Sequence, residues 1–420
     1  MQVFKFGGAS VNSVERVKNI ADILSNYRNQ KILIVISAMG KTTNALEKVA
    51  EAFFSGDSQR ALELFNSVKQ SHLQTAKYLL VKNYNETERQ LADFFTEAEW
   101  LLHGKPVRDF DYYYDQVVCV GELLSTAIVS AYLTEAGITN KWIDVRDVIR
   151  TDDNFRDAIV DWDSTQANIT NIVKPLFKNT DIVITQGFIG STGENESTTL
   201  GREGSDYTAA VFANMLDASG QIIWKDVESV MNADPKQFPN AQPIHELNYD
   251  EVIEMAYYGA QVIHPKTIKP LQNKEIPLYV KCFLNPALEG TCIHNGALKN
   301  LPPIIVLKDN QVLLHLHSQD FSFVGEKPLS RLYEILAEIK LKPNLMQTGA
   351  VNLMMCLDDR ADKIDKLAIK ASEIFNVQVE KGLTLLTIRH YNKGVLEDLT
   401  KDKKIVLKQQ SPETVQVLMK

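Results

Sequence analysis

Residues 198–210 read T-T-L-G-R-E-G-S-D-Y-T-A-A and are the most informative part of the 420-residue sequence. Two glycines bracket Arg202, and glycine permits backbone angles barred to other residues and lets a ligand come close. Ser205 is predicted to cap a helix over 205–216 by accepting a free N–H group of its first turn. With the carboxylate of Asp206, this helix start suits an anion that also carries an amine. An ordinary capped turn fits the same letters, so this stretch alone leaves both interpretations open.

Composition limits the classes of protein that need to be considered. Of the residues, 45% are hydrophobic and 23% are charged, which is ordinary for a globular protein, and 420 residues suggest two or three domains. The formal net charge of -8 argues against a dedicated nucleic-acid binder, because there is no excess of basic residues. We therefore expect small-molecule partners and no nucleic acid.

The four cysteines are widely spaced and show no C-x-x-C pair or zinc spacing. We interpret them as reduced thiols in a reducing compartment. The chain shows no run that resembles a signal peptide, and we find no apolar stretch approaching the length needed to span a bilayer. These observations predict a cytoplasmic protein with no membrane partner.

The N-terminal segment combines a strand, a glycine turn and a helix. The strand V-F-K-F at 3–6 is followed by Gly7 and Gly8, and apolar residues over 14–24 then recur at the spacing of one helix face. This arrangement can point backbone N–H groups at phosphate oxygens. It differs from the Walker motif, because Lys5 precedes the glycines. A tight turn without a ligand remains an alternative.

Two further segments carry polar residues next to apolar ones. The run I-L-I-V-I at 32–36 predicts a buried parallel strand, and the polar loop 37–44 follows its carboxyl end, where ligands bind in open α/β sheets. The helix predicted over 117–136 carries Glu122 among apolar residues. A carboxylate there needs a partner if it is buried, and the sequence leaves open whether it is buried or solvated.

The order of elements predicts the fold class. Strands and helices alternate over about the first 295 residues, which predicts an open three-layer αβα sandwich with a mainly parallel sheet. The segment L-P-P at 301–303 interrupts the pattern and marks a domain boundary between 1–300 and 301–420. Smaller helix and strand units follow, in a pattern typical of ferredoxin-like α+β domains.

Six motifs occur in order along the chain, and their combination is far more specific than any one of them. They are K-F-G-G-A-S at 5–10, S-A-M-G-K-T-T-N at 37–44, G-E-L at 121–123, Q-G-F at 186–188, L-G-R-E-G-S-D at 200–206 and W-K-D at 224–226. Together they closely resemble the aspartokinases of the amino-acid kinase family. The resemblance covers nearly all of the first 295 residues, and the tail is similar to the paired ACT domains of aspartokinases.

The resemblance implies ATP-dependent phosphorylation of the β-carboxylate of L-aspartate, the first step toward lysine, threonine, methionine and diaminopimelate. The substrates would be L-aspartate and ATP, with Mg²⁺ held mostly by phosphates and water. Because an aspartate side chain with a pKa of about 3.9 is already ionised at neutral pH, no general base is needed. Catalysis would rest on positioning and charge neutralisation.

The resemblance also assigns roles to residues. Arg202 would hold the α-carboxylate of aspartate with two hydrogen bonds, and Glu122 would meet the α-ammonium. Lys5 and the amides of residues 7–8 would hold the transferring phosphate, and Asp206 would orient Lys5. The substrate-binding set is Ser37, Thr43, Glu122, Phe188, Arg202 and Ser205. The nucleotide-binding set is Lys5, Gly7, Gly8, Lys225, Asp226, Met231, Lys236 and Gln261.

The sequence departs from the family pattern at several positions. Gln261 stands where lysine is usual, which removes a cation near the nucleotide, and Met231 stands where tyrosine is common. Residues 321–329 lack the usual glycine-rich turn of a first ACT unit. The second unit has no clear second long helix after 395–399 and is expected to be truncated. Inhibition by lysine or threonine therefore stays open, while a homodimer through the ACT-like region is expected.

Two alternative functions remain. One is a related kinase acting on another acidic amino acid, glutamate or N-acetylglutamate, although Glu122 suits a free ammonium better than an acetylated one. The other is a non-catalytic amino-acid sensor built on a decayed kinase. The presence of Lys5, Arg202 and Asp206 argues against the sensor.

Overall fold

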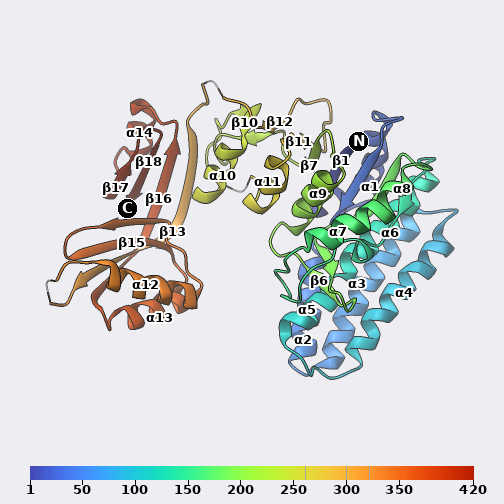
Figure 1. Ribbon diagram of the computed structural model, residues 1–420, viewed down its shortest axis with the longest axis horizontal. Coiled ribbons are helices and arrows are strands. Elements are labelled where there is room, and N and C mark those ends of the chain that lie inside the picture. The colour runs from blue at the N-terminus through green and yellow to red at the C-terminus, as the bar shows by residue number, and fades with distance from the viewer. Residues whose placement is uncertain (261, 299, 321) are drawn as a thin grey trace. The chain divides into compact units, whose positions relative to one another are not determined.

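The computed structural model describes every residue of the chain except Gln261, Lys299 and Phe321 (Figure 1). The chain divides into two compact units. The first comprises residues 1–230, 243–253 and 262–298, and the second comprises residues 231–242, 254–261 and 299–420.

An eight-stranded sheet forms the centre of the first unit, in the order β10-β12-β11-β7-β1-β2-β4-β3. Its strands are β1 (Gln2–Phe6), β2 (Ile32–Ile36), β3 (Lys141–Trp142), β4 (Ile182–Gln186), β7 (Gln221–Lys225), β10 (Glu246–Asn248), β11 (Leu278–Cys282) and β12 (Thr291–His294). All neighbours are parallel except β11 and β12. Two small ribbons pair β5 (Ile189–Ser191) with β6 (Ser197–Thr199), and β8 (Val230–Met231) with β9 (Pro243–Ile244). All five residues of β2 are buried, as expected for a parallel strand covered on both faces.

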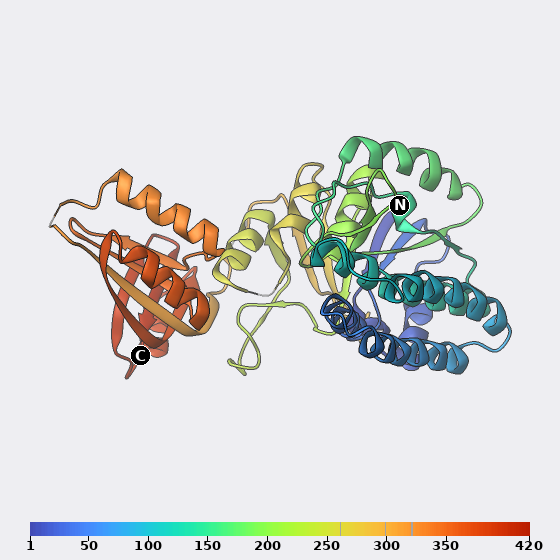
Figure 2. The same ribbon diagram turned by 90° about the horizontal axis from the view of Figure 1, so that it is seen from below.

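Helices cover both faces of this sheet (Figure 2). The helices of this unit are α1 (Val14–Ser25), α2 (Thr42–Phe54), α3 (Ser58–Leu79), α4 (Tyr84–Leu102), α5 (Phe110–Val118), α6 (Val120–Glu135), α7 (Trp162–Asn168), α8 (Lys174–Leu176), α9 (Gly204–Met215) and α11 (Pro265–Gln272), with a π turn at Ile169–Val173 and 3₁₀ turns at Gly8–Val11 and Val145–Asp147. Helix α10 (Tyr249–Tyr258) has residues in both units. Helix α6 packs on β2, β3 and β4, while α9 packs on β1, β2 and β7. The three-layer prediction is confirmed.

Several predicted boundaries differ from the observed ones. From its sequence, the segment 141–145 is a strand candidate, but β3 has two residues before a 3₁₀ turn. The sequence also predicts a helix over 251–262, but α10 ends at Tyr258, because Gly259 adopts a φ of 109° that stops the helical backbone. The expectation that no apolar stretch has the length of a membrane span was wrong. By length and composition, residues 110–135 could span a membrane. However, 78% of their most apolar window is buried inside the protein, as in a core helix.

The second unit is built on a six-stranded antiparallel sheet in the order β14-β15-β13-β16-β18-β17. Its elements are β13 (Ile304–Ser318), α12 (Glu326–Ile339), β14 (Leu345–Thr348), β15 (Asn352–Asp358), α13 (Ala361–Ala371), β16 (Phe375–Arg389), α14 (Lys393–Thr400), β17 (Ile405–Gln410) and β18 (Thr414–Met419). The run from β13 to β16 has the βαββαβ order and the strand arrangement of a ferredoxin-like domain, as predicted. The short strand β14 was not predicted.

The strands β13 and β16 are each 15 residues long and contribute to three hydrophobic clusters. The carboxyl half of β13 and β15 bury Val312, Leu314 and Leu353 against α12 and α13. The carboxyl half of β16 and β18 instead bury Ile388 and Val415 beneath α14. Within the described residues, α14 is the single helix over this second group. A third group, which includes Leu313, Cys356 and Leu418, contains residues of all six strands. One continuous sheet thus carries three hydrophobic clusters.

Candidate active site

A cavity of about 470 Å³ opens at the carboxyl ends of β1, β2 and β4. Lys5 lies near the end of β1, Ser37 follows β2, and Phe188 follows β4. In open α/β sheets this edge is where ligands bind, because successive loops diverge there. The cavity is lined by Lys5, Gly8, Ser37, Ala38, Gly40, Thr43, Tyr114, Glu122, Arg156, Phe188, Gly201, Arg202, Glu203, Gly204, Ser205 and Asp206. All six residues of the predicted substrate-binding set are therefore in one cavity.

Lys5 and Asp206 form a buried ion pair in this cavity. The Lys5 Nζ lies 2.7 Å from Asp206 Oδ1, and the two side chains are 13% and 5% exposed. Burial alone would raise the pKa of the Asp206 carboxyl. The ammonium groups of Lys5 and Lys225 outweigh this effect, so the pKa of Asp206 lies below its ordinary value. Asp206 is thus ionised at neutral pH and fixes the position of the Lys5 ammonium.

The glycine turn after β1 brings backbone N–H groups close to Lys5. A Cβ atom on Gly8 would lie 2.7 Å from the Ala38 carbonyl oxygen, so only glycine lets the loop after β2 pass here. A Cβ atom on Gly7 would lie 3.3 Å from Lys5 Nζ, which shows how close this turn is to the ammonium. The N–H groups of Gly7 and Gly8 donate to no other described residue. Together with the ammonium they make a donor set suited to phosphate oxygens.

Glu122 on α6 is buried, which settles the alternative left open by the sequence. Its side chain is 2% exposed, and Oε1 accepts a 3.3 Å hydrogen bond from the Ala38 N–H. Its second oxygen, Oε2, has no partner among the described residues. Burial raises the pKa of Glu122 to about 8, because the apolar surroundings disfavour the charged form. A buried carboxylate with one unpaired oxygen at a cavity wall is suited to receive a cation.

The loop that carries Arg202 differs in detail from the prediction. Helix α9 begins at Gly204, and its N-cap is Glu203 in a left-handed conformation with φ of 54° and no side-chain cap. The predicted cap by Ser205 was wrong, because Ser205 is already inside the first turn. Its side chain packs on the backbone at Gly187, where a Cβ atom would come within 2.5 Å of Ser205 Cβ. The guanidinium of Arg202 has no carboxylate partner among the described residues and is available to a ligand.

Arg156 is a second guanidinium in the cavity wall that the sequence analysis missed. It has a φ of 69°, a left-handed conformation rare outside glycine. Its guanidinium lies 4.3 Å from the centre of the Tyr114 ring and pairs with Asp111 at 3.2 Å and Glu47 at 3.6 Å. No motif surrounds this residue, so spacing alone gave no signal for it.

A buried carboxylate holds the backbone of Arg156. Asp115 accepts hydrogen bonds from the N–H of Arg156 at 2.9 Å, the N–H of Thr199 at 2.8 Å and the Thr199 hydroxyl at 2.7 Å. Burial raises the pKa of Asp115 to about 7, although these hydrogen bonds act in the opposite direction. An acidic residue amid the apolar residues of α5 was the one sequence signal that could have revealed this network.

Besides Lys5, Gly7 and Gly8, the predicted nucleotide-binding set contains five residues, of which the structure describes four. The Lys225 Nζ donates a 2.6 Å hydrogen bond to the Val262 carbonyl oxygen, and its charge contributes to the low pKa of Asp206. Asp226 follows β7 and is exposed. Met231 and Lys236 belong to the second unit, so their predicted role stays a prediction, and Gln261 lies outside the described residues.

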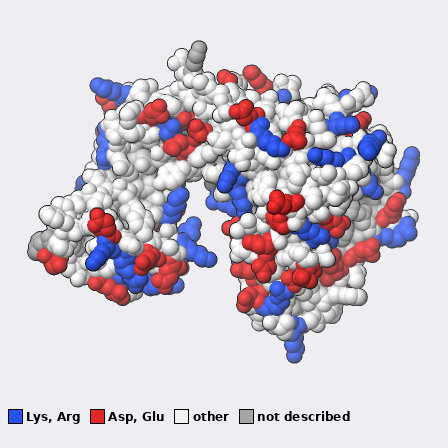
Figure 3. All heavy atoms as spheres, viewed as in Figure 1, with Lys and Arg blue, Asp and Glu red and all other residues white. Residues whose placement is uncertain are grey.

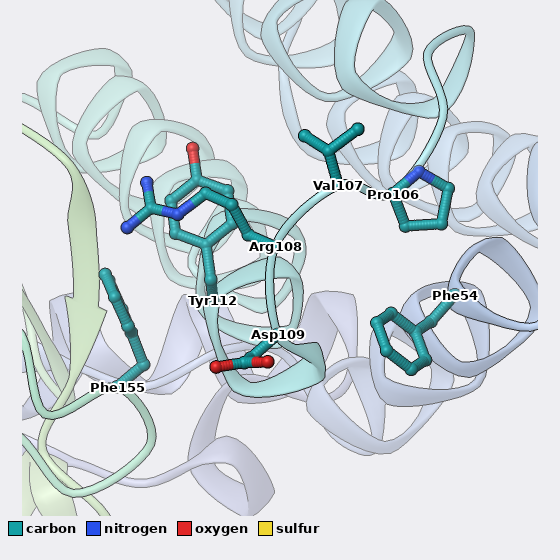
Figure 4. A pocket seen from close by; sticks show the side chains of 7 residues that line it. All are labelled: Phe54, Pro106, Val107, Arg108, Asp109, Tyr112 and Phe155. Atoms are coloured by element: carbon teal, nitrogen blue, oxygen red, sulfur yellow. The ribbon is translucent and has the colours of Figure 1, made fainter.

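The first unit has another hollow, which holds none of the predicted residues. It has a volume of about 620 Å³, and Figure 4 shows the residues that line it: Phe54, Pro106, Val107, Arg108, Asp109, Tyr112 and Phe155. The Arg108 guanidinium lies over the Tyr112 ring at 3.7 Å from its centre and also pairs with Glu196. The cation of this hollow is thus already neutralised by the protein.

Comparison with known proteins identifies the family. Residues 1–282 match the model of the amino acid kinase family. Lysine-sensitive aspartokinase 3 of Escherichia coli (strain K12) is 34% identical over 397 residues, which cover 92% of this chain and 86% of that protein.

Two solved structures resemble the whole chain. One is E. coli aspartokinase III in complex with aspartate and ADP, the R-state, with a TM-score of 0.82, 29% identity and coverage of 100% of this chain and 96% of that chain. The other is the same enzyme in complex with lysine and aspartate, the T-state, with a TM-score of 0.80, 30% identity and coverage of 100% and 95%. The chain therefore belongs to the amino-acid kinase family, within its aspartokinase branch.

Proposed function

We propose that this protein transfers the γ-phosphoryl group of ATP to the β-carboxylate of L-aspartate. The observation that carries the proposal is one cavity in which an unpartnered guanidinium, Arg202, and a half-paired buried carboxylate, Glu122, accompany the Lys5–Asp206 pair. A free amino acid with a second carboxylate matches this set of charges. The similarity to an aspartokinase crystallised with aspartate and ADP supports the same substrates.

The charges of the cavity suggest how aspartate is held. Arg202 binds the α-carboxylate through two parallel N–H···O bonds, the geometry that a guanidinium favours. The α-ammonium donates to Glu122 Oε2, and its charge drives Glu122 to the ionised form. Ser37, Thr43, Phe188 and Ser205 line the remaining space and leave the β-carboxylate directed toward Lys5.

The chemical step needs positioning and charge neutralisation but no general base. An oxygen of the ionised β-carboxylate attacks the γ-phosphorus, and an O–P bond forms while the bond from that phosphorus to the β,γ-bridging oxygen breaks. ADP leaves with the electron pair of the broken bond. Lys5 neutralises charge on the transferring group, Asp206 keeps Lys5 in place, and the N–H groups of Gly7 and Gly8 bind phosphate oxygens.

Mg²⁺ would enter bound to ATP. The described residues contain no group of three or more His, Cys, Asp or Glu side chains placed to hold a metal ion. Phosphate oxygens and water would hold most of the coordination sites of such an ion. When bound with ATP, Mg²⁺ would supply neutralisation of the negative charge of the phosphates. Lys225, Asp226, Met231, Lys236 and Gln261 remain the predicted contacts of the nucleotide.

The second unit suggests assembly and regulation. Its ferredoxin-like arrangement supports an ACT-like role for residues 301–420 beside a catalytic domain over 1–300, and we propose that it mediates a homodimer. Light scattering after gel filtration would give twice the 47.3 kDa chain mass for a dimer, and a single chain mass would refute it. A place in lysine and threonine biosynthesis and a cytoplasmic location are further proposals. Adding lysine or threonine to the assay tests feedback inhibition.

The substrate proposal is tested by trapping the acyl phosphate with hydroxylamine. The protein is incubated with ATP and Mg²⁺ and with aspartate, glutamate or N-acetylglutamate in turn. We expect hydroxamate with aspartate alone. Hydroxamate with glutamate and none with aspartate would instead make it a kinase of another acidic amino acid. No hydroxamate with any of them would favour a non-catalytic sensor.

A further inference from the structure

The second unit contains a small cavity with a strong excess of positive charge. Its volume is about 220 Å³, and it lies where the end of α12, the end of β15 and the middle of β13 meet. Four cationic residues line it: Lys308, Lys340, Lys342 and Arg360. We call it the lysine pocket. Over α12 and α13, by contrast, lysine and arginine side chains are interspersed with carboxylates (Figure 3).

The charges of the lysine pocket are not balanced from within the protein. Asp358 is the one carboxylate in its lining, and it already accepts hydrogen bonds from Gln311 Nε2 at 3.0 Å and Asn344 Nδ2 at 2.8 Å. None of the four cations forms an ion pair with a described carboxylate within 4 Å. Four positive charges therefore face one negative charge, in a chain whose formal net charge is -8.

The geometry shows that two of these cations are held in place. The Lys308 Nζ donates a 2.9 Å hydrogen bond to Asn344 Oδ1, and the Lys342 Nζ lies 4.5 Å from the centre of the Tyr257 ring. Gly259, with a φ of 109°, makes room for Lys308, because a Cβ atom there would fall 2.2 Å from Lys308 Cε. The neighbours thus orient both ammonium groups; of the four cationic residues, Lys308 is half-buried and Lys340, Lys342 and Arg360 are exposed.

A purely structural explanation accounts for only part of the cluster. Lys340 ends α12 in a left-handed conformation, and a cation at a helix C-terminus is favourable by itself. Lys308 and Arg360 lie on other segments, and Lys342 lies two residues beyond Lys340. Without a ligand, their mutual repulsion disfavours the folded state.

We propose that the lysine pocket binds a small phosphate-bearing anion, either inorganic phosphate or a small phosphate monoester. Several ammonium groups around one point are suited to a compact multivalent anion, with Arg360 able to add paired donors. The polar Asn344 and the limited volume favour a phosphate group with a small attached carbon skeleton. Such a ligand would bridge Tyr257 at the end of α10 and the segment after α12, both in the second unit. The proposal is independent of the substrate of the active site.

Binding is tested by titration with inorganic phosphate and with glycerol phosphate, against chloride at equal ionic strength. The titration uses the full-length Lys5→Ala protein, so that phosphate held by the active-site ammonium is not counted. We expect saturable binding seen by calorimetry and a rise in Tm. The double variant Lys342→Gln/Arg360→Gln should bind at least ten times more weakly. The control Lys366→Gln/Lys401→Gln, two exposed lysines outside the pocket, should bind like the parent.

Two results would overturn the proposal: no saturable binding of either anion to the parent, or equal affinity in the pocket variant and the parent. The Tm without ligand distinguishes a binding role from a structural one, because removing repelling charges should leave it unchanged or higher. A second measurement needs no variant at all. Phosphate should protect Lys308, Lys340 and Lys342 of the native protein from chemical acetylation, and equal modification with and without phosphate would refute the site.

Discussion

Replacing Glu122 with glutamine tests the electrostatics of the cavity most directly. Glutamine keeps the shape of the side chain and an oxygen that can accept from the Ala38 N–H, but it cannot ionise. In the wild-type protein burial raises the pKa of Glu122 to about 8, from an ordinary value of 4.5. The substitution therefore removes one ionisable group and changes little else in the cavity.

The effect on stability has a definite sign and pH range. The folded protein holds the Glu122 proton to higher pH than the unfolded chain, so this carboxyl makes the free energy of unfolding fall as pH rises from 4.5 to about 8. At 1.36 kcal/mol per pKa unit, the full loss above pH 8 is up to about 5 kcal/mol. Glu122→Gln should be more stable than wild type by up to that amount above pH 8, and nearly equal to it below pH 4.5.

Glu122→Gln should weaken aspartate binding, although it stabilises the folded protein. If the substrate ammonium pairs with ionised Glu122, binding must expel the proton that free protein holds, about 0.8 proton per aspartate at pH 7.5 for a pKa of about 8. In the Glu122→Gln variant, aspartate binding releases no proton, and the α-ammonium of the substrate has no counter-charge. A buried unpaired charge costs about 3–5 kcal/mol, so aspartate affinity should fall by about 10²–10⁴-fold.

Two measurements check this prediction. Thermal unfolding between pH 5.5 and 9 gives the stability difference, and titration calorimetry with aspartate in two buffers of different ionisation enthalpy gives the proton release. Glu86→Gln, an exposed carboxylate on α4, is the control and should behave like wild type. Unchanged aspartate affinity in Glu122→Gln, or the same proton release as wild type, would show that the ammonium binds elsewhere.

Further substitutions test the other charges of the cavity. Lys5→Ala should lower kcat by at least about 10³-fold while the fold survives, because charge neutralisation is lost; kcat within tenfold of wild type would refute its role. Arg202→Ala should raise the aspartate KM by about 10²-fold and leave the ATP KM unchanged, and an unaltered aspartate KM would place the α-carboxylate elsewhere. Arg156→Gly should be more stable than Arg156→Ala by about 1 kcal/mol in thermal unfolding, because both variants lose the guanidinium contacts but only glycine accepts a φ of 69° without strain; both should raise the aspartate KM severalfold, and an alanine variant as stable as the glycine variant would contradict the strain argument. Chelation of Mg²⁺ should abolish turnover, and added Mg²⁺ should restore it; turnover in excess chelator would argue against Mg–ATP.

The sequence predicted elements best where hydrophobic pattern and burial agree. The apolar run of β2 and the helix face of α1 matched the prediction closely, because each is set by local periodicity and a single buried side. The ferredoxin-like pattern predicted for the second unit was also confirmed. The strand β14 was not predicted, because its sequence L-M-Q-T buries only Leu345 and shows no alternation of buried and exposed residues.

Local chemistry within the active-site loop was harder to predict. The choice of Ser205 as N-cap followed composition, but the cap is Glu203 in a left-handed conformation that a glutamate seldom adopts. The Glu203 side chain accepts a 2.9 Å hydrogen bond from the His264 N–H, a partner 61 residues away. Arg156 depends likewise on Asp115, 41 residues earlier. Such distant hydrogen bonds stabilise backbone conformations that no local pattern encodes.

The strands β13 and β16 bear on how the second unit unfolds and how it can be engineered. Each strand supplies one half to the core under α12 and α13, and β16 supplies its other half to the core under α14. Losing β17 and β18 would expose Leu386 and Ile388 on a strand still needed by the other core. A third cluster joins Leu313 of β13 with Leu407 of β17 and Leu418 of β18. The three clusters should therefore melt in a single transition. A transplant of this unit to another protein would have to carry all three together, from the start of β13 to the end of β18.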